Sequence, residues 1–364
     1  MKANSFFRLS RSIVIICVLG LALIGCGGAP AAPAQVGIST TEQEQNLYWP
    51  TSGWRTATPE QQGMDSRLLD QMLAAVKRQN LNLHSLLVIR HGYLVSETYF
   101  GNYGPETQHE LYSCTKSFVS TLIGIALDQG YIERLDQPVI GFFPERTFQN
   151  VDARKADMSL EDVLTMRTGL DWQEGDPEIQ ALYRSPDWLA NVLGRPMIAD
   201  PGREFNYCSG CSHILAAVLQ KTNGDLLAFA RTSLFDPLGI GSVRWETGSN
   251  SIPIGGWGLQ LTPRDMAKLG YLFLHEGQWD GQQIVSESWV KAAVQSHTAT
   301  GGDLGYGFQW WTYPLYKAYT ALGLYGQTIF VIPEDDLVVV TTAQASDHTP
   351  IFNLIEQYIV PSIL

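Results

Sequence analysis

The segment that follows Thr115 constrains the fold most, because it is apolar on nearly every side when it is drawn as a helix. Its apolar residues are Phe118, Val119, Leu122, Ile123, Ile125 and Ala126. A helix that is hydrophobic all round has to be enclosed by other elements. We therefore predict a buried central helix over residues 113–129, closed by Gly130.

Strand-like segments occur near both ends of the chain, and helical patterns fill the middle. Strand signals lie at residues 85–90, 93–99, 307–311, 328–332 and 337–342, and helical signals at 66–79, 159–166 (with a capping box of Ser159 and Asp162), 212–222 and 351–359. We predict an α/β (α+β) fold in which an antiparallel sheet from both chain ends is flanked by helices. A mainly helical region is inserted at about residues 112–240.

The N-terminus has the pattern of a targeting segment. Lys2, Arg8 and Arg11 precede an apolar run at residues 13–24, which ends at Gly25-Cys26. This run is too short to span a bilayer, which needs about 17 to 25 residues. It resembles a bacterial lipoprotein signal, with Cys26 as the lipidated residue, and an ordinary secretory signal is the alternative.

The signal divides the chain into three parts. Residues 1–25 are the predicted signal peptide, 26–48 a flexible tether rich in Gly, Ala and Pro, and 49–364 a single hydrolase domain. The mature protein is then expected to be exported and anchored on the outer side of the bacterial cell membrane or in the envelope. It would touch lipid through the anchor only.

The charge of the chain excludes one class of partner. The net charge is −12, and removal of the three basic residues of the signal brings it to −15. Such an acidic body argues against binding to nucleic acid. We expect a small ester, amide or peptide as the partner, with no metal and no cofactor, and the oligomeric state stays open.

A candidate nucleophile lies at the start of the central helix. Ser113-Cys114-Thr115-Lys116 places a hydroxyl and an amine three residues apart, on the same face of a helix. A serine needs a nearby base to become nucleophilic. Apolar surroundings lower the pKa of a lysine, so Lys116 can be neutral and accept the serine proton. Ser288 and Lys291 have the same spacing, but we interpret them as a helix cap and a surface charge.

A second motif carries a candidate proton donor. Tyr207 lies in Pro-Gly-Arg-Glu-Phe-Asn-Tyr-Cys-Ser, residues 201–209, directly before an apolar helix. A phenol at such a junction can point into a cleft and pass a proton to a leaving group. We therefore assign catalytic roles to Ser113, Lys116 and Tyr207.

These two motifs, in this order and about 90 residues apart, resemble those of the serine β-lactamase and penicillin-binding-protein superfamily, in particular its class C and esterase-like branch. Three further stretches, at residues 164–170, 234–239 and 261–267, resemble the same family. The resemblance covers the chain from about residue 60 to its end. It implies the fold predicted above and a covalent acyl-enzyme.

In that family a third motif on an edge strand, usually Lys-Thr-Gly or His-x-Gly, lines the cleft. The matching stretch here is Ala-Leu-Gly-Leu-Tyr-Gly-Gln at residues 321–327, which lacks the cation. It is similar to 6-aminohexanoate-dimer hydrolases and related carboxylesterases. This resemblance implies that the backbone amides of Ser113 and Leu324 bind the oxyanion. It also implies that the substrate is contacted by Ser209, Gly323, Tyr325 and Gln327.

Three cysteines remain in the predicted domain: Cys114, Cys208 and Cys211. An exported protein can form a disulfide, and an odd number leaves one thiol free. We expect Cys208 or Cys211 to be oxidised, with Cys114 as one candidate partner. Reading residues 208–213 as zinc ligands is less consistent with the sequence, because the usual second pair of ligands is missing.

The motifs lead to one main functional hypothesis and two alternatives. The main one is a serine hydrolase that cleaves an ester or amide. The first alternative is a D-alanyl peptidase or a β-lactamase, although the missing third-motif cation speaks against β-lactams. The second is a surface receptor that binds such molecules without hydrolysing them.

Overall fold

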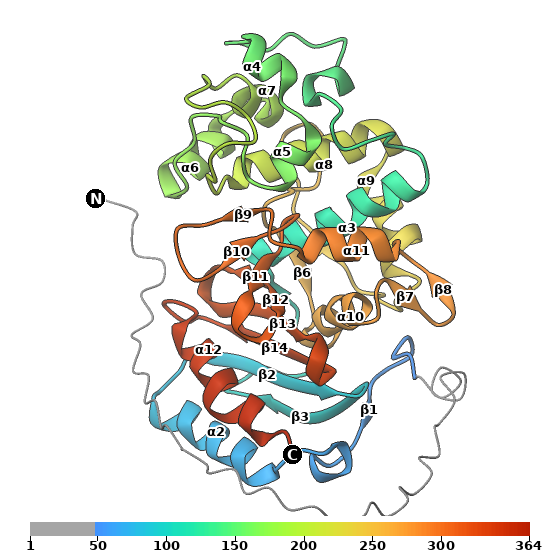
Figure 1. Ribbon diagram of the computed structural model, residues 1–364, viewed down its shortest axis with the longest axis vertical. Helices are drawn as coiled ribbons and strands as arrows, with labels where there is room; N and C mark the ends of the chain where they lie inside the picture. The colour runs from blue at the N-terminus through green and yellow to red at the C-terminus, as the bar shows by residue number, and fades with distance from the viewer. Residues whose placement is uncertain (1–47) are drawn as a thin grey trace, which may run out of the picture. The chain divides into compact units, whose positions relative to one another are not determined.

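A nine-stranded sheet joins the two ends of the chain, as Figure 1 shows by the cyan strands beside the red ones. In sheet order the strands are β1 (Arg55–Thr56), β3 (Tyr93–Tyr99), β2 (Leu83–Arg90), β14 (Leu337–Ala343), β13 (Gln327–Ile332), β12 (Ala318–Gly323), β11 (Trp311–Tyr313), β10 (Gly305–Tyr306) and β9 (Thr298–Ala299). Only β1 pairs in parallel, with β3, and all other neighbours are antiparallel. The predicted antiparallel sheet from both chain ends is thus confirmed.

The central strands are apolar without alternation because helices cover both faces of the sheet. All seven residues of β14 and all six of β13 are buried. On β13, the side chain of Phe330 packs on Phe352 of the terminal helix at a ring distance of 5.8 Å. Ile329, which points the opposite way, lies against the helix that contains Gly270. A strand buried on both faces loses the polar–apolar period of an exposed one.

The helices lie on both faces of the sheet and in a separate region that stands above it in Figure 1. They are α2 (Ser66–Arg78), α3 (Thr115–Asp128), α4 (Ala153–Asp157), α5 (Leu160–Leu164), α6 (Asp176–Arg184), α7 (Trp188–Leu193), α8 (Ser209–Asn223), α9 (Leu226–Ala230), α10 (Pro263–Leu274), α11 (Glu287–Val294) and α12 (Thr349–Leu354). Short strands β4 (His109–Glu110), β6 (Leu259–Leu261) and β5 (Arg244–Trp245) form a second sheet, and β7 (Gln278–Trp279) pairs with β8 (Gln282–Gln283).

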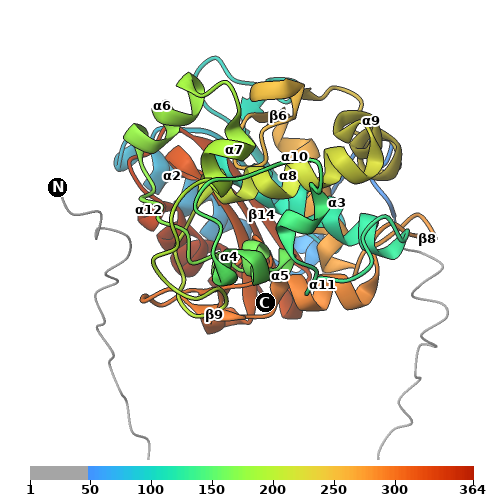
Figure 2. The same cartoon turned by 90° about the horizontal axis from the view of Figure 1, so that it is seen from above.

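The central helix α3 has the surroundings that its composition requires. All its residues from Thr115 to Ala126 are buried. It packs against α8 of the helical region and against β12 of the large sheet. Figure 1 and Figure 2 both show α3 next to α8, and in Figure 1 the helices α4 and α7 lie above them. The helix therefore lies where the sheet and the helical region meet.

Most predicted elements are present, and the prediction of one strand is wrong. The capping box at Ser159 and Asp162 forms as predicted. Of the strand expected over residues 307–311, only Trp311 is in a strand, and residues 307–310 form a turn between β10 and β11 in which Gln309 has a positive φ of 61°. The Gln309 amide donates to the carbonyl of Leu164 at 2.9 Å and accepts from Ser212 at 2.7 Å. These tertiary hydrogen bonds hold a turn where the apolar run alone favours a strand.

The third-motif strand also has a different place from the one expected. The strand β12 is interior, because β11, β10 and β9 extend the sheet beyond it. Its residues are all buried. The third motif therefore lies at the end of an interior strand.

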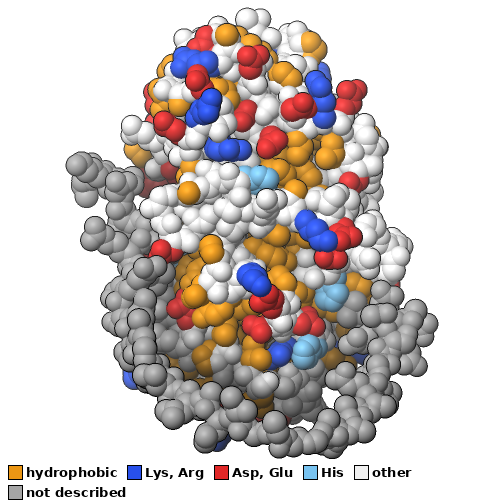
Figure 3. Space-filling model, in the orientation of Figure 1, with side chains coloured by type: hydrophobic (Ala, Val, Ile, Leu, Met, Phe, Trp, Pro, Cys, Tyr) orange, Lys and Arg blue, Asp and Glu red, His pale blue; other side chains and the backbone are white. Residues whose placement is uncertain are grey.

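This description comes from a computed structural model and covers residues 48–364. The predicted signal peptide, Cys26 and nearly all of the predicted tether lie outside the described residues. Residues Trp49–Leu364 form one compact unit. No helix within residues 48–364 combines the length and the apolarity needed to cross a bilayer. On the face in Figure 3, acidic and basic side chains lie beside one another, so the negative charge of the chain is not concentrated there.

Candidate active site

Ser113 and Lys116 lie at the entrance to the central helix. Ser113 belongs to a short 3₁₀ turn, Tyr112–Cys114, and α3 begins two residues later. The Nζ atom of Lys116 lies 2.8 Å from the Oγ atom of Ser113. Tyr112, directly before the serine, has a positive φ of 46°, which is uncommon for a bulky residue. The turn therefore brings the two polar tips together at a bend of the backbone.

Lys116 is enclosed by the protein and has three oxygen atoms around its amine. The residue is 1% exposed. Besides Ser113, its Nζ donates to Ser209 Oγ at 3.0 Å and to the carbonyl of Gly256 at 2.9 Å. Burial lowers the pKa of Lys116 to about 8, and the negative charge of Glu174 opposes part of that shift. A minority of the amine is thus neutral near pH 7, whereas an exposed lysine would have almost none in that form.

Tyr207 closes the site from the start of α8. Its ring centroid lies 4.8 Å from Lys116 Nζ, and the Ser113 side chain is close enough to the phenol to oppose part of the rise in the Tyr207 pKa. Burial, more than any other effect, raises the Tyr207 pKa well above its usual value. The ring stacks on Trp311 at 5.6 Å and meets Tyr306 edge-on at 6.2 Å. The phenol is therefore held protonated, beside an aromatic wall.

Glu174 is a member of this constellation that sequence reasoning missed. It lies in the exposed loop before α6. Its Oε1 accepts from Ser209 Oγ at 2.5 Å, and its Oε2 accepts from the Ser209 amide at 2.9 Å and from Trp172 Nε1 at 2.7 Å. A carboxylate in an irregular loop leaves no periodicity in the sequence. Its position a few residues after the family-like stretch 164–170 is the one signal that could have drawn attention to it.

Ser209 therefore has a different environment from the substrate contact expected. It is buried, and its hydroxyl is shared between Lys116 and Glu174. Its interactions are with the protein's own amine and carboxylate.

The third motif lies beside the nucleophile. A Cβ atom on Gly323 would stand 2.2 Å from the carbonyl of Leu111, so a side chain here would force β12 away from the turn that carries Ser113. Tyr325 has a positive φ of 64°, and its ring meets that of Tyr112 at 5.3 Å. Leu324, whose backbone amide we predict to bind the oxyanion, is 52% exposed. Its role stays a prediction.

Gln327 does not have the place that a substrate contact requires. The side chain is buried, and its Nε2 donates to the carbonyls of Leu324 at 3.0 Å and Ala343 at 2.9 Å. Its Oε1 accepts from the Ala343 amide at 3.1 Å. Gln327 thus stabilises the loop of the third motif, because its side-chain amide is hydrogen-bonded to backbone atoms of Leu324 and Ala343.

The cysteines pair locally. Cys208 and Cys211 form a disulfide across the first turn of α8, and Cys114 is a buried free thiol. The expected free thiol is present, whereas a bridge to Cys114 is not formed. Cys114 instead donates to the carbonyl of Gln327 at 3.4 Å. The disulfide also removes the zinc interpretation of residues 208–213, since it uses both sulfur atoms.

The second serine–lysine pair is a surface feature, as interpreted from its sequence, although the residue that caps the helix is Ser286 and not Ser288. Ser286 caps α11, and Ser288 donates to the hydroxyl of Ser286 at 3.1 Å. Lys291 is exposed and forms ion pairs with Glu287 and Glu276. The spacing alone therefore does not make an active site. The two serine–lysine pairs differ in the burial of the amine, because Lys116 is buried and Lys291 is exposed.

Acidic and aromatic side chains lie next to the site on the side of the small sheet. Trp257 follows the Lys116 acceptor Gly256, and its Nε1 donates to the Tyr183 hydroxyl at 3.0 Å. That hydroxyl donates to Glu246 at 2.9 Å. Glu110, three residues before the nucleophile, has a raised pKa because it is partly buried and close to the Glu246 carboxylate. The Glu110 and Glu246 carboxylates thus lie close to each other at the small sheet.

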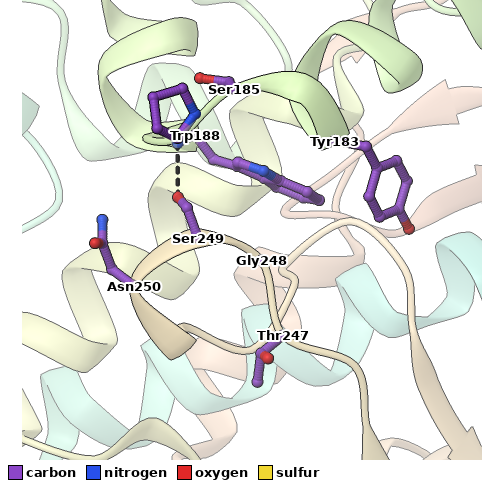
Figure 4. A pocket seen from close by; sticks show the side chains of 8 residues that line it. Tyr183, Ser185, Trp188, Thr247, Gly248, Ser249 and Asn250 are labelled. Atoms are coloured by element: carbon purple, nitrogen blue, oxygen red, sulfur yellow. Dashed lines mark hydrogen bonds between the residues drawn. The ribbon is translucent and has the colours of Figure 1, made fainter.

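A hollow of about 350 Å³ lies beyond Tyr183. In Figure 4, Tyr183 and Trp188 face the loop of residues 247–250, and the Trp188 amide donates to Ser249 Oγ at 2.7 Å. None of Ser113, Lys116 and Tyr207 lines it. Within residues 48–364, no group of three or more His, Cys, Asp or Glu side chains is placed to hold a metal ion.

Comparison with known proteins gives consistent matches. A family model described as Beta-lactamase matches residues 61–359. The chain is 27% identical over 290 residues to a 6-aminohexanoate-dimer hydrolase of Paenarthrobacter ureafaciens, covering 72% of this chain and 73% of that protein.

Two solved structures illustrate the shared fold. A candidate 6-aminohexanoate-dimer hydrolase of Bacillus anthracis has a TM-score of 0.71 and 19% identity, covering 91% of this chain and 98% of that one. EstCE1, described as a hydrolase with promiscuous acyltransferase activity, has a TM-score of 0.68 and 17% identity, covering 80% and 98%. Both have the arrangement of sheet and helices described above.

Proposed function

The chain belongs to the beta-lactamase family, and we propose that it is a serine hydrolase that cleaves an ester or a linear amide through a covalent acyl-enzyme. The observation that carries this proposal is the position of Lys116 Nζ, 2.8 Å from Ser113 Oγ in a buried site that lowers the lysine pKa to about 8. A neutral amine within hydrogen-bond distance of a hydroxyl is the arrangement that general-base activation requires.

The first half-reaction acylates Ser113. Lys116 takes the proton from the hydroxyl, and the Oγ electron pair forms a bond to the substrate carbonyl carbon. The carbonyl oxygen becomes an oxyanion, for which we propose the backbone amides of Ser113 and Leu324 as donors. The bond to the leaving group then breaks, and the leaving group takes a proton from Tyr207. The Lys116 ammonium returns its proton to the Tyr207 oxygen.

The second half-reaction releases the acyl group. Water gives a proton to the Lys116–Tyr207 pair and attacks the ester carbon, and Ser113 leaves with that proton restored. Each residue therefore ends in the state in which it began. The raised pKa of Tyr207 suits this role, because a phenol that stays protonated can donate to a leaving group.

The charge of the third motif favours neutral or cationic substrates over β-lactams, which carry a carboxylate. Residues 321–327 carry no lysine, arginine or histidine. We place Glu110 and Glu246 on the approach to Ser113, because Glu110 is three residues before the nucleophile and Glu246 is linked through Tyr183 to Trp257, next to Gly256. A carboxylate on a β-lactam would meet negative charge with no cation to hold it. The relative from Paenarthrobacter ureafaciens, described as a 6-aminohexanoate-dimer hydrolase, supports the ester or linear-amide class.

Active-site labelling tests this function. We expect a fluorophosphonate probe to add one adduct to the intact protein, detected by mass spectrometry and mapped to Ser113, and Ser113→Ala to abolish it. The matched control is Ser288→Ala, which removes the serine of the surface pair and should label fully. Absence of an adduct on the wild-type protein, or an adduct that persists in Ser113→Ala, would remove the mechanism.

A substrate panel then separates the hydrolase from the alternatives. Short p-nitrophenyl esters, linear amides, nitrocefin and a D-alanyl-D-alanine peptide are compared in wild type and Ser113→Ala. Ester or amide turnover that depends on Ser113 supports the proposal. Saturable binding without turnover would favour a receptor, and release of D-alanine a peptidase.

We also propose that the protein is a lipoprotein anchored through Cys26 outside the cell membrane. The support is the sequence pattern that ends at Cys26. Cys26→Ala should release the protein from the membrane fraction. Recovery of an unmodified, uncleaved N-terminus from the native host would contradict the anchor.

A further inference from the structure

We infer that Glu174 is a positioning residue for the proposed hydrolase: acting through Ser209, it directs the lone pair of the Lys116 amine at Ser113. This inference rests on the proposed function and deepens it. The geometry that carries it is a continuous chain of hydrogen bonds from Glu174 to Ser209, from Ser209 to Lys116 and from Lys116 to Ser113.

The Glu174 carboxylate determines which atoms donate and which accept in this series of hydrogen bonds. Three donors converge on Glu174: the Ser209 hydroxyl, the Ser209 amide and Trp172 Nε1. The amide and the indole N–H can only donate, and a carboxylate accepts from all three of these groups. The single hydroxyl proton of Ser209 is therefore committed to Glu174. Towards Lys116, Ser209 can offer only a lone pair.

The second acceptor fixes the remaining orientation of the amine. The carbonyl of Gly256, 2.9 Å from Nζ, can only accept. A neutral lysine amine has two N–H bonds and one lone pair. One N–H is directed to Ser209 and the other to Gly256. The lone pair is thus left for the third neighbour, Ser113 Oγ at 2.8 Å, whose proton it can take.

The charged and titratable groups around Lys116 give Glu174 a second, separable effect. Cys114 and Tyr207 have raised pKa values, because both are buried, and so both remain neutral. Tyr306, behind Tyr207, is likewise held protonated by burial. The Gly256 segment and Ser209 are uncharged. The Glu174 carboxylate, in contrast, favours the ammonium form of Lys116 and so opposes part of the fall in the Lys116 pKa.

Removal of the Glu174 charge therefore has two consequences of opposite sign. The Lys116 pKa falls, which makes more neutral base available at a given pH. At the same time the Ser209 hydroxyl is free to rotate and donate to the lone pair of Lys116, which takes that lone pair away from Ser113. A residue that only supports the loop would change neither the pKa of the amine nor its direction.

The test compares pH profiles of Glu174→Gln and the wild-type protein. The glutamine keeps the size of the side chain but carries no charge and can donate as well as accept. We expect the plateau of kcat for an ester to fall by about tenfold or more, in line with the sensitivity of rates to misplaced catalytic groups. The rise of kcat/KM on the acid side of the pH profile (the acid limb) should occur at lower pH, because the Lys116 pKa is lower in the variant. Glu174→Asp, which keeps the charge with a shorter reach, should leave the limb nearer its wild-type position.

The matched control is Glu178→Gln, four residues further on. Glu178 forms an ion pair with Arg195 and makes no contact with the Lys116 site. Loss of this charge should leave both the plateau and the limb unchanged. A plateau that falls equally in Glu178→Gln would assign the effect to the loop in general.

A direct titration of Lys116 separates this inference from the proposed function. The ¹³Cε signal of Lys116, assigned by its loss in Lys116→Ala, reports the amine pKa without any turnover. A lower pKa in Glu174→Gln supports the electrostatic link even if the wild-type protein shows no hydrolysis. If the wild-type protein shows no hydrolysis, the proposed function is wrong, although Glu174 still changes the Lys116 pKa. The positioning role of Glu174 is then also wrong, because it requires the hydrolase. An unmoved Lys116 titration overturns the inference.

Ser209→Ala supplies a second route if Glu174→Gln does not fold. It removes the relay but leaves the loop of Glu174 in place. Because Glu174 is inferred to orient Lys116 through Ser209, the plateau in the double variant should be no lower than in Ser209→Ala alone. An unchanged plateau in Ser209→Ala, or additive losses in the double variant, would contradict the relay.

Discussion

Lys116 and Tyr207 lie in one buried site, with the amine 4.8 Å from the centre of the phenol ring, and their pKa values move in opposite directions. Burial lowers the pKa of Lys116 to about 8 and raises that of Tyr207. The same desolvation has both effects because it favours the neutral form of each group. Near neutral pH the site therefore contains an available base and a protonated acid side by side.

The first prediction concerns the pH dependence of hydrolysis. The base is the neutral amine, so kcat/KM for a neutral ester should rise with pH through the Lys116 pKa of about 8 and then reach a plateau. Below that value the ammonium has no lone pair. No alkaline fall is expected in the range of stable folding, since the Tyr207 pKa is raised. Activity that is already maximal in mildly acidic solution would contradict Lys116 as the base.

A second prediction follows from the role of Tyr207. Tyr207→Phe keeps the ring against Trp311 but removes the proton donor. Poor leaving groups need protonation most, so hydrolysis of alkyl esters and amides should fall by about 10²- to 10⁴-fold. Turnover of p-nitrophenyl esters should fall much less. Steady-state rates on both substrate types measure the difference, and equal losses would assign Tyr207 a packing role only.

The third prediction concerns substrate charge. Glu110, Glu174 and Glu246 form no ion pair with any residue in the described part of the chain. An ester with a positively charged group should therefore have a higher kcat/KM than its isostere with a carboxylate, by roughly fivefold for one interaction of about 1 kcal/mol. Added salt should shrink this ratio.

The combined variant Glu110→Gln and Glu246→Gln checks the origin of that preference. It should reduce the ratio between the cationic and anionic esters while neutral esters change little. A ratio that is the same in the variant and the wild type would place the selectivity elsewhere.

The fourth prediction concerns packing of the central helix. Alanine normally stabilises a helix interior relative to glycine by about 1 kcal/mol. At Gly124, however, the new Cβ would stand 2.5 Å from ring atoms of Trp289. Gly124→Ala should therefore lower the free energy of unfolding by about 1 to 3 kcal/mol. The matched control is Gly141→Ala, where no atom lies within 4 Å, and denaturant unfolding should show no loss there.

The fifth prediction concerns the thiols. Cys114 is fully buried, and burial raises its pKa, so iodoacetamide should not modify it in the native protein. Unfolding without reductant should expose Cys114 alone among the cysteines of the domain. Reduction should then add Cys208 and Cys211. Peptide mapping that finds a native adduct on Cys114, or a bridge to it, would contradict this pairing.

Much of the fold was predictable because its signals are local or periodic. The apolar circumference of α3 required a buried central helix, and the strands on either side of His91-Gly92 and of residues 333–336 were evident from turn residues between apolar runs. Residues 307–311 show the limit of this reasoning. Their apolar run is the same in a strand and in a buried turn, and hydrogen bonds from Gln309 to distant segments decided between them.

By itself the sequence determined that Ser113 and Lys116 share one face, because a spacing of three residues is a property of the helix alone. It also determined that Tyr207 stands where a loop meets a helix. Only the tertiary structure decided what surrounds the amine. Ser209 begins α8, whereas Gly256 and Glu174 lie in two separate loops, and the three stand up to 140 positions from Lys116. No local sequence pattern predicts these contacts, since they depend on how the helical region packs against the sheet.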